Sequence, residues 1–185
     1  KFFVTGNNKE SNFHVVDSEY RGLAALDNVK AIVIAEGYAT ADTLSQALSC
    51  PVVAAFDSGN LLKVAQVLQK KYPQKPIVIA GDDDLTQESI NGKNPGKEKA
   101  MEAAQLVNGA VVLPIFAPDE QMSQQLSDFN DLANKSVLGI EAVKRQVGSV
   151  VEKVSQQAKQ DSLLKLQVPI EPKQQEIKQK RALIR

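Results

Sequence analysis

The chain has 185 residues, of which 43% are hydrophobic and 24% charged, proportions typical of globular proteins that exclude wholesale disorder. The 22 basic and 22 acidic residues cancel, so attraction to nucleic acid must come from a local patch, and no apolar run approaches the roughly 20 residues that span a bilayer. Cys50 is the only cysteine and His14 the only histidine, which excludes an internal disulfide and a zinc site of the usual Cys and His type.

Residues 1–30 predict a small lead-in element. The stretch FFVTGNNKESNFHVVD favours a β-hairpin that turns at residues 6–11. The chain begins at Lys1, with no charged-then-apolar leader after it, so we expect an excised fragment without a signal peptide. A single cysteine also fits a reducing compartment, and we expect a cytoplasmic location with no membrane partner.

From residue 31 onward, short apolar runs alternate with helical patterns. Runs typical of strands buried on both faces cover residues 31–35, 51–56, 76–81 and 109–116. Apolar residues at helical spacing predict helices over residues 40–49, 61–72 and 97–107. Every crossover is too long for a hairpin, so we expect an α/β fold with a four-stranded, mostly parallel sheet flanked by helices.

The remainder of the chain is polar at first and then amphipathic. From about Gly139, apolar residues at i, i+3 and i+4 spacing predict a helix, and the Pro-, Gln- and Lys-rich tail at 169–185 is expected to be mobile or ordered by a partner. We therefore divide the chain into a lead-in element (1–30), a main α/β unit (31–138) and a C-terminal helix with its tail (139–185).

Acidic side chains follow two of the predicted strands. Glu36 follows the first strand, Asp82 follows the third, and Asp84 lies two residues further on. If these strands are neighbours, the three carboxylates converge at the carboxyl edge of the sheet. Carboxylates that close together raise one another's pKa unless a cation lies between them, and Mg²⁺ or Mn²⁺ is the natural partner. The alternative is that these aspartates are solvated turn residues.

The segment NPGKEKA, residues 94–100, could supply an anion site. Gly96 lies where a helix is expected to begin, so free backbone N–H groups and the helix dipole would favour a phosphate. Lys97 and Lys99 could add positive charge, although an ordinary helix start with exposed lysines explains them as well. Metal ligands beside an anion site point to phosphoryl or nucleotidyl chemistry.

Two further segments carry candidate residues. In DFNDLA, residues 128–133, Asp131 could supply an outer carboxylate for a second ion, whereas Asp128 could be either a ligand or a helix cap. In the turn FDSGN after the second strand, Gly59 and Asn60 are possible substrate contacts, as is Gly37 beside Glu36.

The candidate residues lie in segments that follow one another along the chain in this order: AIVIAEGYATADTL, PVVAAFDSGNL, IVIAGDDD with NPGKEKAMEAA, GAVVLPIF and DFNDLA. In their order and spacing, these segments resemble the Toprim domain. This Rossmann-like domain is shared by bacterial-type primases, type IA and type II topoisomerases, and certain nucleases. Its hallmarks are a strand-end glutamate followed by glycine and a strand-end Asp-x-Asp, matched here by Glu36 with Gly37 and by Asp82 with Asp84. The set is most similar to TraC-type primases of conjugative plasmids and to mobile-element primases, over about residues 1–140.

The resemblance implies roles for the candidate residues. Glu36 would act as general acid or base in nucleotidyl transfer, Asp82 and Asp84 would coordinate Mg²⁺ or Mn²⁺, and Asp131 is a less direct match to an additional metal-site acid. Replicative primases place a glycine and a basic residue almost directly after the Asp-x-Asp, whereas here residues 85–94 intervene. This departure puts in doubt the equivalence of Gly96 and Lys97 with that element.

The function implied is that of a DNA primase core acting on single-stranded DNA and nucleoside triphosphates in plasmid conjugation or replication. Its partners would be a relaxase, a helicase or other parts of the same polypeptide. One alternative is a Toprim nuclease or topoisomerase fragment. Another is a non-catalytic interaction module whose C-terminal helix docks a partner protein.

Overall fold

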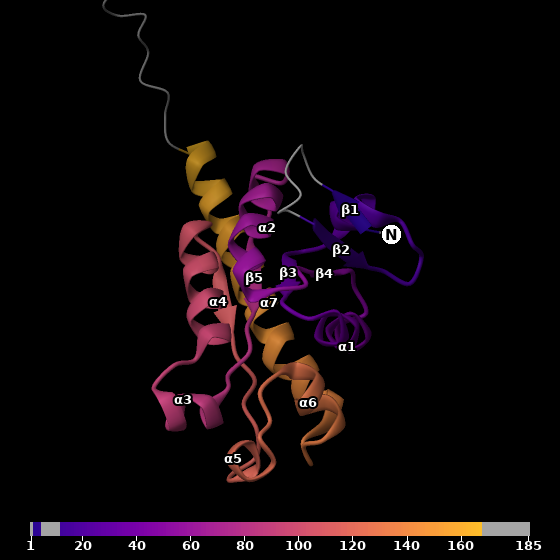
Figure 1. Ribbon diagram of the computed structural model, residues 1–185. Helices are drawn as coiled ribbons and strands as arrows, with labels where there is room; N and C mark the ends of the chain where they lie inside the picture. The colour runs from indigo at the N-terminus through magenta and orange to yellow at the C-terminus, as the bar shows by residue number, and fades with distance from the viewer. Residues whose placement is uncertain (1, 5–11, 168–185) are drawn as a thin grey trace, which may run out of the picture.

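A computed structural model describes residues 2–4 and 12–167 of the chain, and within them the strands form one six-stranded sheet of order β1-β2-β4-β3-β5-β6 (Figure 1). The strands are β1 (Phe2–Val4), β2 (Asn12–Val16), β3 (Ile32–Ala35), β4 (Val52–Ala54), β5 (Ile77–Ala80) and β6 (Ala110–Val112). The neighbours β4, β3, β5 and β6 are all parallel. The expected four-stranded parallel arrangement is therefore confirmed.

The N-terminal hairpin belongs to the same sheet. β1 pairs antiparallel with β2, and β2 pairs antiparallel with β4, where His14 lies opposite Ala54. The predicted hairpin strands are thus present, but they extend the main sheet instead of forming an element apart. The predicted turn at residues 6–11 lies outside the described residues.

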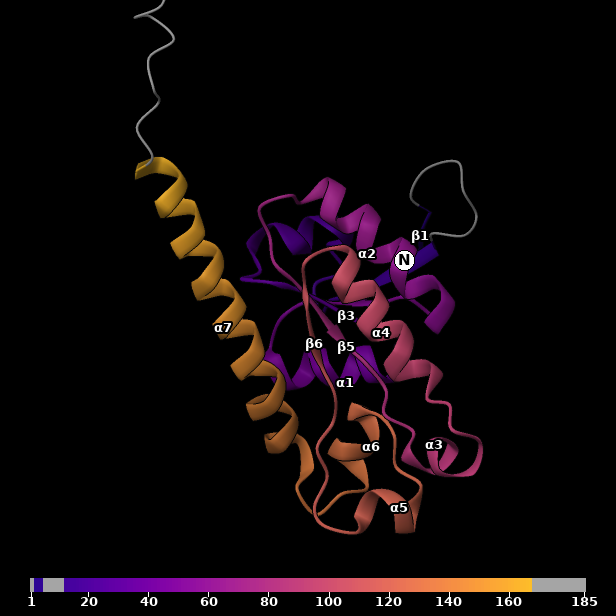
Figure 2. The same cartoon turned by 90° about the vertical axis from the view of Figure 1, so that its left-hand side faces the viewer.

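Helices cover both faces of the sheet. α2 (Ser58–Lys71) and α4 (Pro95–Leu106) pack on one face, and α1 (Tyr38–Leu48), α6 (Phe129–Asn134) and α7 (Gly139–Gln167) pack on the other (Figure 2). Alternate residues of a strand point to opposite faces, so Ile32 and Ile34 of β3 enter the first layer while Val33 and Ala35 enter the second. Burial on both faces explains why these strands are continuous apolar runs.

Several short elements were not predicted. They are the 3-10 helix η2 (Gly22–Asn28), α3 (Leu85–Asn91) and α5 (Glu120–Gln124), while α6 was considered only as a possible cap. The predicted strand over 109–116 was too long, since β6 ends at Val112 and Pro114 follows. α3, α5 and α6 gather beyond the carboxyl ends of the central strands (Figure 1).

α7 is an integral part of the core. Its residues Ala142, Val143 and Val147 are fully buried against the sheet, and partly buried valines continue the contact. The apolar stripe of the predicted C-terminal helix is therefore explained by packing along the first half of the helix. The tail at 169–185 lies outside the described residues, and within the described part of the chain no helix combines the length and apolar character that crossing a membrane requires.

Candidate functional site

The two acidic strand ends lie side by side. β3 and β5 are parallel neighbours in register, with Ala35 opposite Ala80, and Glu36 and Asp82 follow within two residues of that pair. Both carboxylates therefore lie at the carboxyl edge of the sheet, where ligands bind in open α/β sheets. The spatial condition on which the predicted metal site depended is met.

Asp82 is the most perturbed acid of this edge. Burial raises the pKa of the Asp82 carboxyl to about 7, and the charges of Glu36, then Asp128 and Asp131, contribute to the increase. Its Oδ1 atom is buried and finds no hydrogen-bond partner among the described residues. An orphaned buried carboxylate oxygen is costly, and a cation or a proton would relieve it.

The start of α4 packs closely against Asp82. A Cβ atom added at Gly96 would lie 3.0 Å from the Cβ of Asp82 and 3.3 Å from its backbone oxygen. A larger residue would require the neighbouring atoms to shift by a few tenths of an ångström, so glycine favours the close approach of the N-terminal turn of α4 and its positive dipole end to Asp82. This packing gives a reason for glycine at position 96, whereas its role in phosphate binding stays a prediction.

Glu36 is half-buried and shares its surroundings with a residue that the sequence analysis missed. Burial raises the pKa of Glu36, the charges of Asp57 and Asp128 raise it further, and a hydrogen bond from the backbone N–H of Ser58 opposes them. Asp57 follows β4 and caps α2, accepting a hydrogen bond from the backbone N–H of Gly59 at 2.8 Å. Its position just beyond a strand end, as for Glu36, is the signal that could have identified it.

α6 brings two more acids to the same edge. Asp128 caps this helix, accepting hydrogen bonds from the backbone N–H of Asp131 at 2.7 Å and from the hydroxyl of Thr40 in α1 at 2.9 Å. Asp131 accepts a hydrogen bond from the backbone N–H of Ser127 at 3.0 Å and pairs with Lys135 at 2.8 Å. Asp128 is thus a helix cap, and both acids also contribute to the field at Asp82.

Asn94 ties together the segment that follows Asp82. Its side chain is 3% exposed and donates to Asp83 Oδ1 at 2.8 Å and to Glu88 Oε2 at 2.9 Å, while its oxygen accepts from the backbone N–H of Asp84 at 3.3 Å. The Asp84 carboxylate caps α3 through the backbone N–H of Gln87. Residues 85–94 therefore form a compact segment that these hydrogen bonds hold at the start of α4.

The predicted phosphate-binding lysines lie in different surroundings. Lys97 is half-buried, with its Nζ 3.5 Å from Asp83 and 3.7 Å from Glu88, so it is beside the acidic segment. Lys99 is exposed and pairs with Glu102 along α4 at 2.6 Å. The structure brings Gly96 and Lys97 to the site and leaves Lys99 on the outer surface of the helix.

The predicted substrate contacts lie at the neighbouring strand ends. Gly37 caps the start of α1. Asn60 donates to the backbone oxygens of Asn12 at 2.7 Å and Ala55 at 2.8 Å, so it joins β2 to the end of β4. Its role as a substrate contact, like that of Gly59, stays a prediction.

The acidic side chains of this edge can be compared with the ligands that a metal ion requires. In residues 2–4 and 12–167, no three His, Cys, Asp or Glu side chains are arranged to hold a metal ion as they stand. The residues present fit a hard divalent cation in chemistry, because they are carboxylate oxygens and one buried oxygen of Asp82 lacks any other partner among those residues.

Comparison with known proteins gives a consistent result. Residues 31–137 match the family model described as the Toprim domain. A curated DNA primase TraC from Escherichia coli is 37% identical over 216 residues, covering 86% of this chain and 15% of the relative. A second DNA primase TraC from the same organism is 38% identical over 238 residues, covering 98% of this chain and 22% of the relative. No solved structure matches the chain significantly. The chain belongs to the Toprim domain family.

Proposed function

We propose that this chain is the metal-binding catalytic core of a DNA primase, which transfers nucleotides to a growing primer on single-stranded DNA. The observation that carries the proposal is the convergence of Glu36 and Asp82 at the ends of adjacent parallel strands, together with a buried Asp82 oxygen that has no hydrogen-bond partner among the described residues. The relatives named DNA primase TraC support the same reaction. We place this activity in the cytoplasm, in plasmid conjugation or replication.

Asp82 and Asp84 would hold Mg²⁺ or Mn²⁺, with Asp131 as an outer ligand. A divalent ion bound there supplies positive charge that offsets the charge of nucleotide phosphates. The Gly96 end of α4 would bind a phosphate oxygen through the backbone N–H of Gly96, because the N–H of Lys97 donates to the Asn94 side chain, and Lys97 would add charge by leaving its contacts with Asp83 and Glu88.

Glu36 would act as general acid or base in the reaction. Because burial and neighbouring acids raise its pKa, Glu36 accepts a proton more readily than an ordinary carboxylate does. Its place at the end of β3, beside Asp82, would let it take the proton from the primer 3′-hydroxyl as that oxygen bonds to the α-phosphorus of the nucleotide and pyrophosphate leaves. Asp82 and Asp84 would hold the cation that attracts the nucleotide phosphates.

The test is primer synthesis by the Asp82→Asn/Asp84→Asn double variant on a single-stranded template with nucleoside triphosphates. Synthesis should be lost while circular dichroism shows a folded protein, and Asp161→Asn, in the last part of α7, is the matched control. Primer synthesis at the wild-type rate by the double variant would reject the assignment. Cleavage of labelled DNA with Mn²⁺ and no nucleotides would instead favour the nuclease alternative.

This chain covers only 15% and 22% of the length of the relatives, so partner contacts are also proposals. We expect a relaxase, a helicase or other parts of the same polypeptide to act with this core. A measured increase in primer yield when such a partner is added would support this expectation.

A further inference from the structure

A pocket of about 460 Å³ lies on the outer flank of α1, between that helix, the end of β2 and the loop that follows β2. It begins at Tyr38, two residues after Glu36, and reaches Ser49 and Pro51 beyond the C-terminal end of the helix. The 11 residues of α1 make it about 16 Å long, so the pocket runs from the edge of the carboxylate cluster away from it. It is therefore a neighbour of the proposed active site and not part of it.

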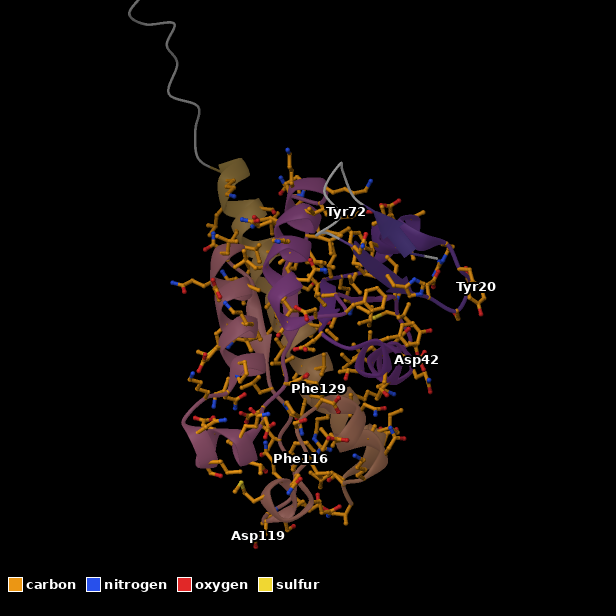
Figure 3. The ribbon with its side chains drawn as sticks, in the orientation of Figure 1. Tyr20, Asp42, Tyr72, Phe116, Asp119 and Phe129 are labelled. Carbon is orange, nitrogen blue, oxygen red and sulfur yellow. The ribbon has the colours of Figure 1, made fainter. Side chains whose placement is uncertain are left out.

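Exposed aromatic rings line this pocket. The side chain of Tyr38 is 50% exposed, and its ring centroid lies 5.6 Å from that of His14 at an interplanar angle of 40°. Tyr20 is 79% exposed, and its backbone has φ 54°, which is unfavourable for a residue other than glycine. Figure 3 shows Tyr20 on the loop and Asp42 on α1, both on the same side of the molecule. Exposed aromatic rings beside a pocket are suited to stack a planar ligand.

Hydrogen-bond acceptors lie on the α1 wall of the pocket. The Nε2 of Gln46 donates to Asp42 Oδ2 at 2.8 Å, which fixes both side chains one turn apart. This leaves Asp42 Oδ1 and the amide oxygen of Gln46 as acceptors. Acceptors of this kind pair with the exocyclic amino group of cytosine and with the amino groups of guanine and adenine, but they find fewer donors on thymine.

The charge of the pocket excludes a simple phosphate site. Asp17 and Glu19 pair with Arg21 at 2.8 and 3.3 Å, and Asp42 adds a further carboxylate, so acids outnumber the guanidinium. A phosphate backbone would be repelled from this surface, whereas an uncharged heteroaromatic ring would not. The rings and acceptors together thus favour a base over the backbone that carries it.

We propose that this pocket binds an unpaired nucleobase bearing an amino group, stacked on Tyr38 and hydrogen-bonded by Asp42, with Tyr20 on the opposite loop of the pocket lining. The inference rests on the proposed function, because a primase meets such bases both in its single-stranded template and in the incoming nucleotides. The two sources share the same ring chemistry, and the experiment separates them.

The test measures equilibrium binding of fluorescein-labelled oligo(dC) and oligo(dT) to the full 185-residue chain in EDTA, and in parallel the binding of CTP and UTP by calorimetry. The wild type should bind oligo(dC) more tightly than oligo(dT). Tyr38→Ala should weaken oligo(dC) binding by about tenfold, as expected for one lost stacking contact, while Tyr38→Phe retains it. Asp42→Asn should reduce the preference for dC over dT. Tyr72→Phe, whose hydroxyl bonds the backbone oxygen of Leu23 away from the pocket, is the control.

Each outcome bears on the proposal. Preference for oligo(dC) without CTP binding assigns the site to the template, and CTP binding with the same variant effects assigns it to the incoming nucleotide. Absence of binding, or equal binding of dC and dT by the wild type and all variants, would overturn it. Base-selective binding by a chain that synthesises no primer would retain the pocket and reject only the primase assignment.

Discussion

Replacing Asp82 with asparagine is expected to stabilise the metal-free protein at pH 8, although the same change removes a proposed metal ligand. The pKa of Asp82 is raised from its ordinary 3.8 to about 7 in the folded protein, mainly by burial. A carboxyl group with a raised pKa ionises more easily in the unfolded chain than in the native one. Its effect on stability is absent below pH 3.8 and becomes unfavourable as the pH rises towards 7.

The magnitude follows from the size of the shift. At about 1.4 kcal/mol per pKa unit, a shift of roughly three units corresponds to about 4 kcal/mol above pH 7, of which about 1.5 kcal/mol is already present at pH 5. Relaxation around the charge reduces these values, so we expect Asp82→Asn to raise the free energy of unfolding by about 1–3 kcal/mol at pH 8. The gain at pH 4 should be close to zero.

The assay is urea unfolding in EDTA at pH 4, 5, 6 and 8, followed by far-ultraviolet circular dichroism. Asp161→Asn, which removes an exposed carboxylate on α7, is the matched control and should change little with pH. A stability difference between Asp82→Asn and the wild type that does not grow with pH, or a variant less stable than the wild type at pH 8, would refute the reasoning about this site.

Three further predictions concern the surroundings of Asp82 and the N-terminal loop. Gly96→Val should lower the free energy of unfolding by about 1–3 kcal/mol in urea titrations, because its side chain would collide with Asp82, and calorimetry should show weaker Mn²⁺ binding. Asn94→Ala should lower the free energy of unfolding by about 1–3 kcal/mol in the same assay, because the hydrogen bonds of the buried Asn94 to Asp83 and Glu88 are lost; a free energy of unfolding equal to that of the wild type would contradict this. Arg21 lowers the pKa of Asp17 to about 2. Because solvent screens the charge of the exposed Arg21, Asp17→Asn should lower the free energy of unfolding by only on the order of 1 kcal/mol at pH 7. That loss should shrink as the pH falls from about 4 towards 2, which acid denaturation measured on both proteins would show.

The strands could be predicted from the sequence because they are buried on both faces. Residues such as Val33 and Ile34 face opposite layers, yet both must be apolar, so the strand appears as an unbroken run. The order of strands in the sheet could not be predicted in this way, because periodicity along a chain does not indicate which strands are neighbours. The adjacency of β3 and β5 therefore entered the prediction as a condition, which the structure meets.

The fine structure of the site could not be predicted in the same way. An aspartate after a strand can be a metal ligand, a turn residue or a helix cap, and Asp84 and Asp128 each cap a short helix while lying in or beside the acidic cluster. The clamp made by Asn94 joins residues 11 positions apart in the chain, and no local pattern marks it. Asp57 was missed because its turn was examined only for glycine and amide contacts.

Calorimetric titration of Mn²⁺ into the wild type, Asp82→Asn and Asp161→Asn tests the central claim most directly, namely that acids from neighbouring strand ends share a cation. The wild type and Asp161→Asn should bind the ion with the same affinity, whereas Asp82→Asn should bind it at least about tenfold more weakly. Equal affinity in all three proteins, or no binding by the wild type, would contradict the account.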